Sequence, residues 1–137
     1  MILVINTIVG GRLLYCLVNK KGVIISQDIT VGYKQAEKFL PLLDNLLKSN
    51  KIKINSIKEI IVAVGPGGFS SVRLGMIMAN TLSYSLNIPA VGLKTAEFKN
   101  LAELINKGFN KLKGKKGFNL IKPFYGKPPN ITKSKKR

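Results

Sequence analysis

The N-terminal part of the chain contains three short apolar runs separated by turn residues. The runs cover residues 1–5, 13–18 and 23–29. Gly10 and Gly11 separate the first two runs, and residues 19–22 form a second turn. Short apolar runs joined by tight turns are typical of antiparallel strands. The pattern therefore predicts a three-stranded antiparallel meander.

From Tyr33 onwards, apolar residues recur every three or four positions instead. This spacing predicts a helix over 33–48 with one apolar stripe. A continuous apolar run at 59–64 predicts a fourth strand. We expect a second helix over 69–86 and a fifth strand over 89–93. Strands that alternate with helices in this way pair in parallel through right-handed crossovers.

The ends of the later helices have sequence signals of their own. Asn87 follows the second helix and can close it. Thr95 is a candidate N-cap for a last helix that runs through Ile105, and Glu97 in its first turn suits the helix dipole. We therefore predict an α/β fold with a mixed five-stranded sheet. Its three antiparallel strands come first, parallel strands follow, and helices cover the faces.

Basic residues greatly outnumber acidic ones and concentrate near the C-terminal end. The 137 residues include 23 Lys or Arg and 6 Asp or Glu, which gives a formal charge of +17. Residues 107–137 contain eleven of the basic residues, no acidic residue and several Gly and Pro. We therefore divide the chain into a lobe, 1–106, and a basic tail, 107–137. The charge favours an anionic partner, with nucleic acid ahead of a membrane surface or an acidic protein.

Missing residue types exclude several chemistries. The chain has no His, which excludes Ser-His-Asp and Cys-His nucleophile systems and imidazole metal sites. Its single Cys, Cys16, excludes an intrachain disulfide and lies in an apolar run, where we expect a buried thiol. No apolar run reaches the roughly 18 residues of a membrane span. No secretory signal is visible either, so we expect a cytoplasmic protein without a metal or a membrane partner.

The most distinctive segment is a glycine-rich loop between the fourth strand and the second helix. Backbone N–H groups at such a position favour an anion. The loop matches neither the P-loop nor the GxGxxG dinucleotide motif. It is therefore either a tight turn or an anion site, and Arg73, one helical turn later, can bind an anion, pair with a carboxylate or remain solvated. The loop residues are Gly65, Pro66, Gly67, Gly68, Phe69 and Ser70.

Residues 65–75, with the sequence GPGGFSSVRLG, resemble the GPGSFTGVRIG signature of the TsaB (YeaZ) family of tRNA threonylcarbamoyladenosine biosynthesis proteins. The opening ILVINT, at 2–7, resembles the family's ILAIDT, and FLPLLDNLL, at 39–47, resembles its LLPLIDELL segment. Residues 87–95 resemble the strand that follows the signature helix, and 122–126 resemble the family's closing segment. The main resemblance extends over residues 1–96.

The resemblance implies a single lobe of the actin-like ATPase (ribonuclease H-like) fold, without most of the family's second lobe. It also implies a non-catalytic subunit that binds the catalytic subunit TsaD through the two helices of this lobe. TsaD forms N6-threonylcarbamoyladenosine in tRNA, and a TsaE ATPase completes the bacterial system. Asn6 stands where the superfamily has an Asp, and an amide lacks the negative charge that Mg²⁺ prefers. We therefore expect no ATP hydrolysis and no cofactor.

The first two helices have apolar residues that suit either a partner or the chain's own core. Ordinary core is the usual interpretation of an amphipathic helix. The resemblance favours a docking surface for a TsaD-like subunit or, when the chain is alone, for a second copy in a homodimer. The candidate interface residues are Tyr33, Phe39, Leu40, Leu43, Leu47, Arg73, Met76 and Asn80.

The basic tail either solubilises the protein as a disordered segment or contacts tRNA. Lysines that neutralise phosphates give a salt-dependent affinity, and the interleaved aromatic residues can stack on unpaired bases. Two other functions stay open: a general RNA-binding module and a degenerate nucleotide-binding protein. The candidate RNA contacts are Lys113, Lys115, Lys116, Lys133, Lys135, Lys136 and Arg137.

Overall fold

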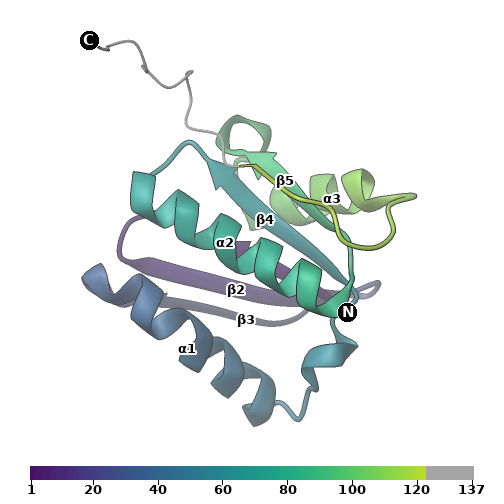
Figure 1. Ribbon diagram of the computed structural model, residues 1–137, viewed down its shortest axis with the longest axis horizontal. Coiled ribbons are helices and arrows are strands. Elements are labelled where there is room, and N and C mark those ends of the chain that lie inside the picture. The colour runs from purple at the N-terminus through teal and green to yellow at the C-terminus, as the bar shows by residue number, and fades with distance from the viewer. Residues whose placement is uncertain (123–137) are drawn as a thin grey trace.

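The structure is a computed structural model that describes residues 1–122, except for the side chains of Ile24 and Phe69 (Figure 1). Its sheet is mixed, with Ile2 opposite Val18 in an antiparallel pair and opposite Glu59 in a parallel pair. This arrangement confirms the predicted sheet. Across the sheet, the strands follow the order β3 (Gly22–Thr30), β2 (Arg12–Asn19), β1 (Ile2–Asn6), β4 (Glu59–Gly65) and β5 (Ala90–Lys94).

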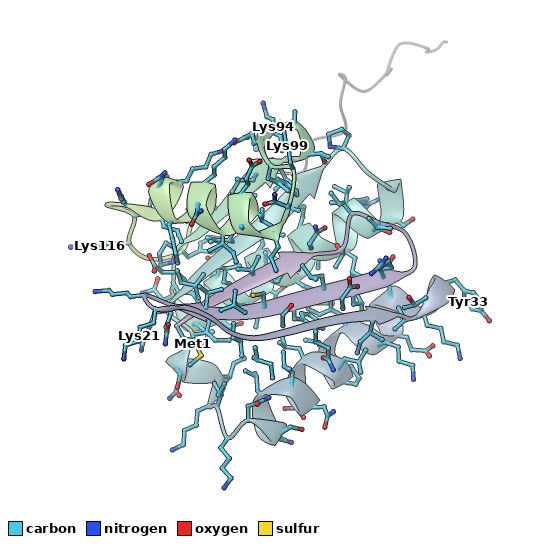
Figure 2. The ribbon with its side chains drawn as sticks, turned by 180° about the vertical axis from the view of Figure 1, so that it is seen from behind. Met1, Lys21, Tyr33, Lys94, Lys99 and Lys116 are labelled. Carbon is cyan, nitrogen blue, oxygen red and sulfur yellow. The ribbon has the colours of Figure 1, made fainter. Side chains whose placement is uncertain are left out.

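Helices cover both faces of the sheet. Helices α1 (Gln35–Ser49) and α2 (Phe69–Leu86) lie on one face (Figure 1), and α3 (Leu101–Leu112) lies on the other (Figure 2). Strand β1 contributes to both cores because successive side chains of a strand point to opposite faces. Leu3 packs in the core beneath α1 and α2, whereas Val4 packs in the core beneath α3.

The last helix begins later than predicted. Thr95 is not its N-cap, because Thr95–Glu97 forms a short 3-10 turn and the Thr95 hydroxyl donates a hydrogen bond to the carbonyl of Pro66 at 2.7 Å. The N-cap is Asn100, whose side chain accepts a hydrogen bond from the Glu103 N–H at 2.9 Å. Phe98 has an extended backbone (φ −143°, ψ 143°), which separates the two elements.

Part of the predicted tail is folded onto the lobe. Helix α3 continues through residues 107–112, and the segment 117–121 then passes from the end of α2 at Asn87, over the start of β5, to Asn80 within α2. We call residues 117–121 the strap. The Asn80 side chain holds the strap with two hydrogen bonds of 2.9 Å each. It accepts one from the Ile121 N–H and donates the other to the Ile121 carbonyl. The Asn119 side chain binds both backbone groups of Ala90 in the same two-bond manner.

None of the helices within residues 1–122 has the length and apolar character required to cross a bilayer.

Candidate functional site

The glycine loop packs tightly against the connection between β1 and β2. A Cβ on Gly67 would lie 2.6 Å from the carbonyl oxygen of Ile8, a distance that real Cβ atoms do not reach. The Gly68 N–H donates a hydrogen bond to that same oxygen at 3.1 Å. Gly65 has a φ of +95° and forms a cis peptide bond with Pro66. Close packing therefore accounts for Gly67, and the positive φ accounts for Gly65, as expected for a tight strand-to-helix turn.

A buried polar network joins this region to both helices. Gln35, the first residue of α1, accepts a hydrogen bond from the Ser71 hydroxyl at 2.6 Å. Its Nε2 donates to the carbonyl of Arg12 at 2.6 Å. The Thr7 hydroxyl donates to the carbonyl of Ser71 at 2.7 Å. These side chains were not among the predicted site residues, because a glutamine at the start of a helix has no distinctive sequence signal.

The residues of this region do not form a cluster suited to acid–base or metal chemistry. The side-chain oxygen Oδ1 of Asn6 accepts a hydrogen bond from the Ile8 N–H at 3.1 Å, which closes a local turn. In the part of the chain that the structure describes, no three His, Cys, Asp or Glu side chains come together as metal ligands do. Burial raises the pKa of the Cys16 thiol to about 11, so this group is a protonated core residue at neutral pH.

One carboxylate at the C-terminal end of β5 has a shifted pKa. Glu97 forms an ion pair with Lys111 at 2.8 Å. The hydrogen bond from the Lys111 side chain is the largest cause that lowers the pKa of Glu97, and a backbone hydrogen bond from Lys94 adds to it. Lys111 also donates to the carbonyl of Gly92, so this pair occupies the edge of β5. The pair is therefore a structural contact of the strand edge.

The predicted interface residues divide between surface and core. Tyr33 is 96% exposed and Leu40 is 53% exposed, so both are accessible to a partner. Arg73 is also exposed. Phe39 and Met76 are buried at 0% and 3%. Their assignment to a partner surface is therefore wrong: both face the sheet and belong to the lobe's own core.

The other predicted interface residues have intermediate roles. Leu43 and Leu47 belong to the core, but they also line a groove on the surface of the lobe. Asn80 is half-buried because it holds the strap at Ile121. All three side chains are therefore held within the lobe, and at most their exposed edges can contact a partner.

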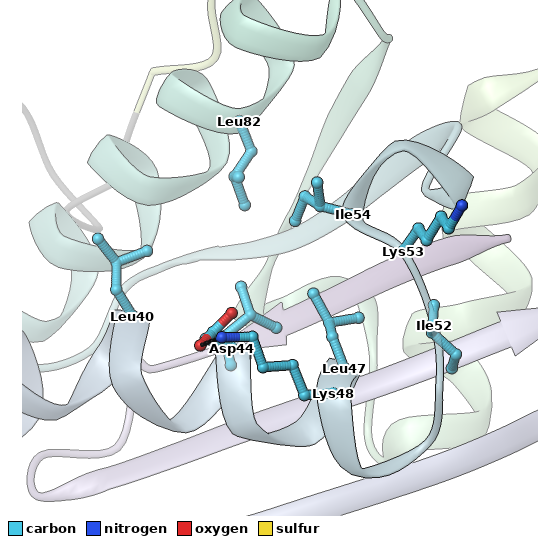
Figure 3. A pocket seen from close by; sticks show the side chains of 9 residues that line it. Leu40, Asp44, Leu47, Lys48, Ile52, Lys53, Ile54 and Leu82 are labelled. Carbon is cyan, nitrogen blue, oxygen red and sulfur yellow. Dashed lines mark ion pairs between the residues drawn. The ribbon is translucent and has the colours of Figure 1, made fainter.

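The groove lies between the C-terminal halves of α1 and α2 and has a volume of about 560 Å³ (Figure 3). Its wall is mostly apolar, and an ion pair between Lys48 and Asp44, at 3.0 Å, lies at the rim. The groove is lined by Leu40, Leu43, Asp44, Leu47, Lys48, Ile52, Lys53, Ile54 and Leu82.

Further exposed apolar residues on the same face of the sheet were not predicted. Ile77 is 54% exposed on α2, and Ile54 is 41% exposed beside the groove. Tyr84 is 72% exposed near the end of α2. We call the groove together with Leu40 and Ile77 the α1/α2 surface. Its apolar character is unusual for an exposed helix face and is typical of an interaction site.

The predicted RNA contacts are described only in part. Lys113, Lys115 and Lys116 follow helix α3 and are exposed. The remaining candidates, Lys133, Lys135, Lys136 and Arg137, lie outside the described residues.

Comparisons with known proteins match this chain to one group of tRNA-modification proteins. A family model described as TsaD, tRNA N6-adenosine threonylcarbamoyltransferase, matches residues 31–111. A relative from Buchnera aphidicola subsp. Schizaphis graminum, named tRNA threonylcarbamoyladenosine biosynthesis protein TsaB, is 33% identical over 98 residues, which cover 72% of this chain and 44% of the relative. A protein of the same name from Buchnera aphidicola subsp. Baizongia pistaciae is 40% identical over 52 residues, 38% of this chain and 24% of that protein.

A solved structure, YeaZ from Pseudomonas aeruginosa, has the same fold. It matches with a TM-score of 0.62 at 20% identity, over 68% of this chain and 43% of that one. The likeness confirms the predicted actin-like (ribonuclease H-like) lobe. The chain spans less than half the length of these relatives.

Proposed function

Because the chain belongs to the TsaB (YeaZ) family, we propose that it is a non-catalytic subunit that supports N6-threonylcarbamoyladenosine formation in tRNA. In this proposal, it binds a TsaD-like catalytic subunit through the α1/α2 surface. The observation that supports the proposal most directly is the apolar groove between α1 and α2, with the exposed Leu40 in its wall and a further exposed apolar side chain, Ile77, on α2.

The physical driving force for docking is the burial of this exposed apolar area. Each Å² of apolar surface removed from water contributes roughly 25 cal/mol. The groove accepts the side chains of a partner helix, as helix-in-groove recognition requires. Lys53 and the Lys48–Asp44 pair lie at its edge, so charged groups surround an apolar centre. This arrangement is typical of protein interfaces, in which polar groups form the rim.

The residues of the chain also favour a supporting role over catalysis. The proposed subunit has no His, and Asn6 supplies a neutral amide at the end of β1, where an anionic metal ligand would be needed for Mg²⁺-dependent phosphate chemistry. The Gly68 N–H at the start of α2 is already bonded to the carbonyl of Ile8. Chemistry on the tRNA is therefore assigned to the TsaD-like partner.

Size-exclusion chromatography of the full chain with its cognate TsaD-like subunit tests this function. We expect a co-eluting complex at micromolar concentrations, together with tRNA modification that depends on both proteins. Separate elution, with tRNA modification unaffected by this chain, would contradict the proposal. A second copy of the chain is expected to occupy the α1/α2 surface when the catalytic subunit is absent, so addition of that subunit should dissociate any homodimer.

A further inference from the structure

One end of the lobe is formed where the parallel strands begin and all three helices finish. Ile2 of β1 pairs with Glu59 of β4, and Ile60 pairs with Ala90 of β5, so these strands begin at the same end. The β2–β3 turn lies there too, because Ile2 pairs with Val18 near the end of β2.

Two chain segments bring exposed lysines to this end. The β2–β3 turn contributes Lys20 and Lys21. The connection from α1 to β4 contributes Lys51, Lys53 and Lys58, and the Lys58 N–H donates a hydrogen bond to the carbonyl of Met1 at 2.8 Å. Figure 2 shows Lys21 and Met1 near one another, far from Tyr33, which lies in the 3-10 turn before α1.

A third segment adds lysines after the end of helix α3. Lys113, Lys115 and Lys116 are exposed in the turn that leads to the strap. Figure 2 places Lys116 on the same side of the molecule as Lys21. A cavity lined by Lys20 and Phe109 of α3 confirms that the turn and the helix are neighbours. We call this set of eight exposed lysines, from three segments, the lysine end.

Carboxylates do not neutralise this charge. None of the eight ammonium groups forms an ion pair with a carboxylate of residues 1–122. Glu59 is the acidic residue at the start of β4, and Asp44 on α1 is paired with Lys48. Elsewhere on the lobe, carboxylates do pair with cations, as in Arg12 with Asp28 and Lys111 with Glu97. Ion pairs therefore do not compensate the positive charge of the lysine end.

Two exposed aromatic rings lie beside the lysine end. Tyr84, in the last turn of α2, and Phe118, in the strap, contact edge to face with ring centroids 5.4 Å apart. Tyr84 is 72% exposed and Phe118 is 40% exposed, so each ring leaves surface open to solvent. The Phe118 N–H donates to the side chain of Asn87, which fixes the position of the strap. Exposed rings beside cations are the combination on which unpaired bases stack.

We propose that the lysine end binds RNA, with lysines on the phosphates and the Tyr84–Phe118 pair against an unpaired base. The choice of RNA over other polyanions rests on the proposed function in tRNA modification. The lysine end shares Lys53 with the α1/α2 surface, but none of its other seven lysines lines the groove. It includes three of the predicted tail contacts, Lys113, Lys115 and Lys116, and adds five lysines from two segments that precede residue 107.

RNA titrations with the full chain alone, at several salt concentrations, test this inference. The probe is an unmodified tRNA transcript. The test variant is Lys20→Gln, Lys21→Gln and Lys116→Gln. The matched control is Lys34→Gln, Lys38→Gln and Lys99→Gln. It removes the same amount of charge from positions outside the lysine end and the tail. Because each lost phosphate contact lowers the slope of log K against log salt by about 0.7–0.9, we expect the test variant to lose about 2–3 units of slope.

The result is decisive in either direction. We expect at least a tenfold loss of affinity at moderate salt for the test variant and a change of less than twofold for the control. Equal losses in both variants, or no RNA binding by the unmodified chain, would overturn the proposal. The proposal would also be overturned if the test variant lost binding to phosphatidylserine vesicles while its RNA binding stayed unchanged. If the test variant does not fold, Phe118→Leu provides the second measurement: its affinity for single-stranded oligouridine should fall severalfold. Unchanged affinity would overturn the stacking contact.

The titration omits the TsaD-like subunit, so its failure would leave the proposed docking function standing. Failure of the chromatography experiment would likewise leave RNA binding measurable.

Discussion

The Ser71 hydroxyl donates a hydrogen bond to Oε1 of Gln35 at 2.6 Å, and this contact joins α2 to α1 near the start of both helices. At the other end of the helices, the apolar groove separates Leu47 from Leu82. A hydrogen bond therefore joins the two helices near their N-terminal ends, and the groove separates them towards their C-terminal ends. The α1/α2 surface depends on this arrangement, because the polar contact fixes where the two helices begin.

Gln35→Ala should lower the free energy of unfolding by about 2–3 kcal/mol, because the buried Ser71 hydroxyl and the half-buried carbonyl of Arg12 lose their partner. Denaturant unfolding followed by circular dichroism measures the change. Asn45→Ala, at an exposed position of the same helix, is the matched control and should change stability by no more than about 0.5 kcal/mol. Equal effects of the two substitutions would contradict the role of Gln35.

Gly67→Ala should destabilise the protein by about 2 kcal/mol. The new Cβ would lie 2.6 Å from the carbonyl oxygen of Ile8, so the backbone of the loop or of Ile8 would have to move. Gly10→Ala is the control, since a Cβ on Gly10 meets nothing within 4 Å. Thermal unfolding of both variants measures the difference. If Gly67→Ala were as stable as Gly10→Ala, the loop would not be packed as described.

The Glu97–Lys111 pair should make stability depend on pH in the acidic range. The pKa of Glu97 lies below its ordinary value of 4.5 in the folded protein, mainly because Lys111 donates a hydrogen bond to the carboxylate. A lowered folded-state pKa gives a contribution that is present above 4.5 and is lost as the pH falls through the folded pKa. Unfolding midpoints measured at pH 7 and at pH 3 should therefore differ less in Glu97→Gln than in the unmodified protein. Glu37→Gln, which alters an exposed carboxylate of α1, should preserve the original pH dependence.

Cys16 should be unreactive in the folded protein. It is fully buried, and burial raises the pKa of its thiol to about 11, so little thiolate forms at pH 8. A thiol-specific chromogenic disulfide should therefore label Cys16 only after unfolding in denaturant. Rapid labelling of the native protein would show that β2 opens readily.

Much of the fold followed from local residue patterns. Asn87 was predicted to close the second helix, and it does so with a left-handed backbone (φ 52°). The start of the last helix was mispredicted, because two capping residues compete within a few positions. Asn100 caps the helix, while Thr95 is engaged with Pro66, a contact distant in sequence that local patterns do not contain.

The candidate interface was harder to predict for a geometric reason. Leu40 follows Phe39 directly, and Ile77 follows Met76, so each pair lies at the boundary of an apolar stripe. Periodicity identifies the stripe but not which of its edges the sheet covers. The structure buries Phe39 and Met76 and exposes Leu40 and Ile77. Contacts of the strap, such as Asn80 with Ile121, depend on tertiary packing that no spacing in the sequence indicates.

If the α1/α2 surface binds a TsaD-like subunit, a charge placed on that surface should weaken the complex, and a calorimetric titration of two matched variants measures this effect. Ile77→Arg places a charge on the proposed surface, whereas Val23→Arg places one on strand β3 at a residue with similar exposure, 51% against 54%. The dissociation constant should rise at least about tenfold for Ile77→Arg and change less than twofold for Val23→Arg. Equal affinities for the two variants, or a larger loss in Val23→Arg, would contradict binding at this surface.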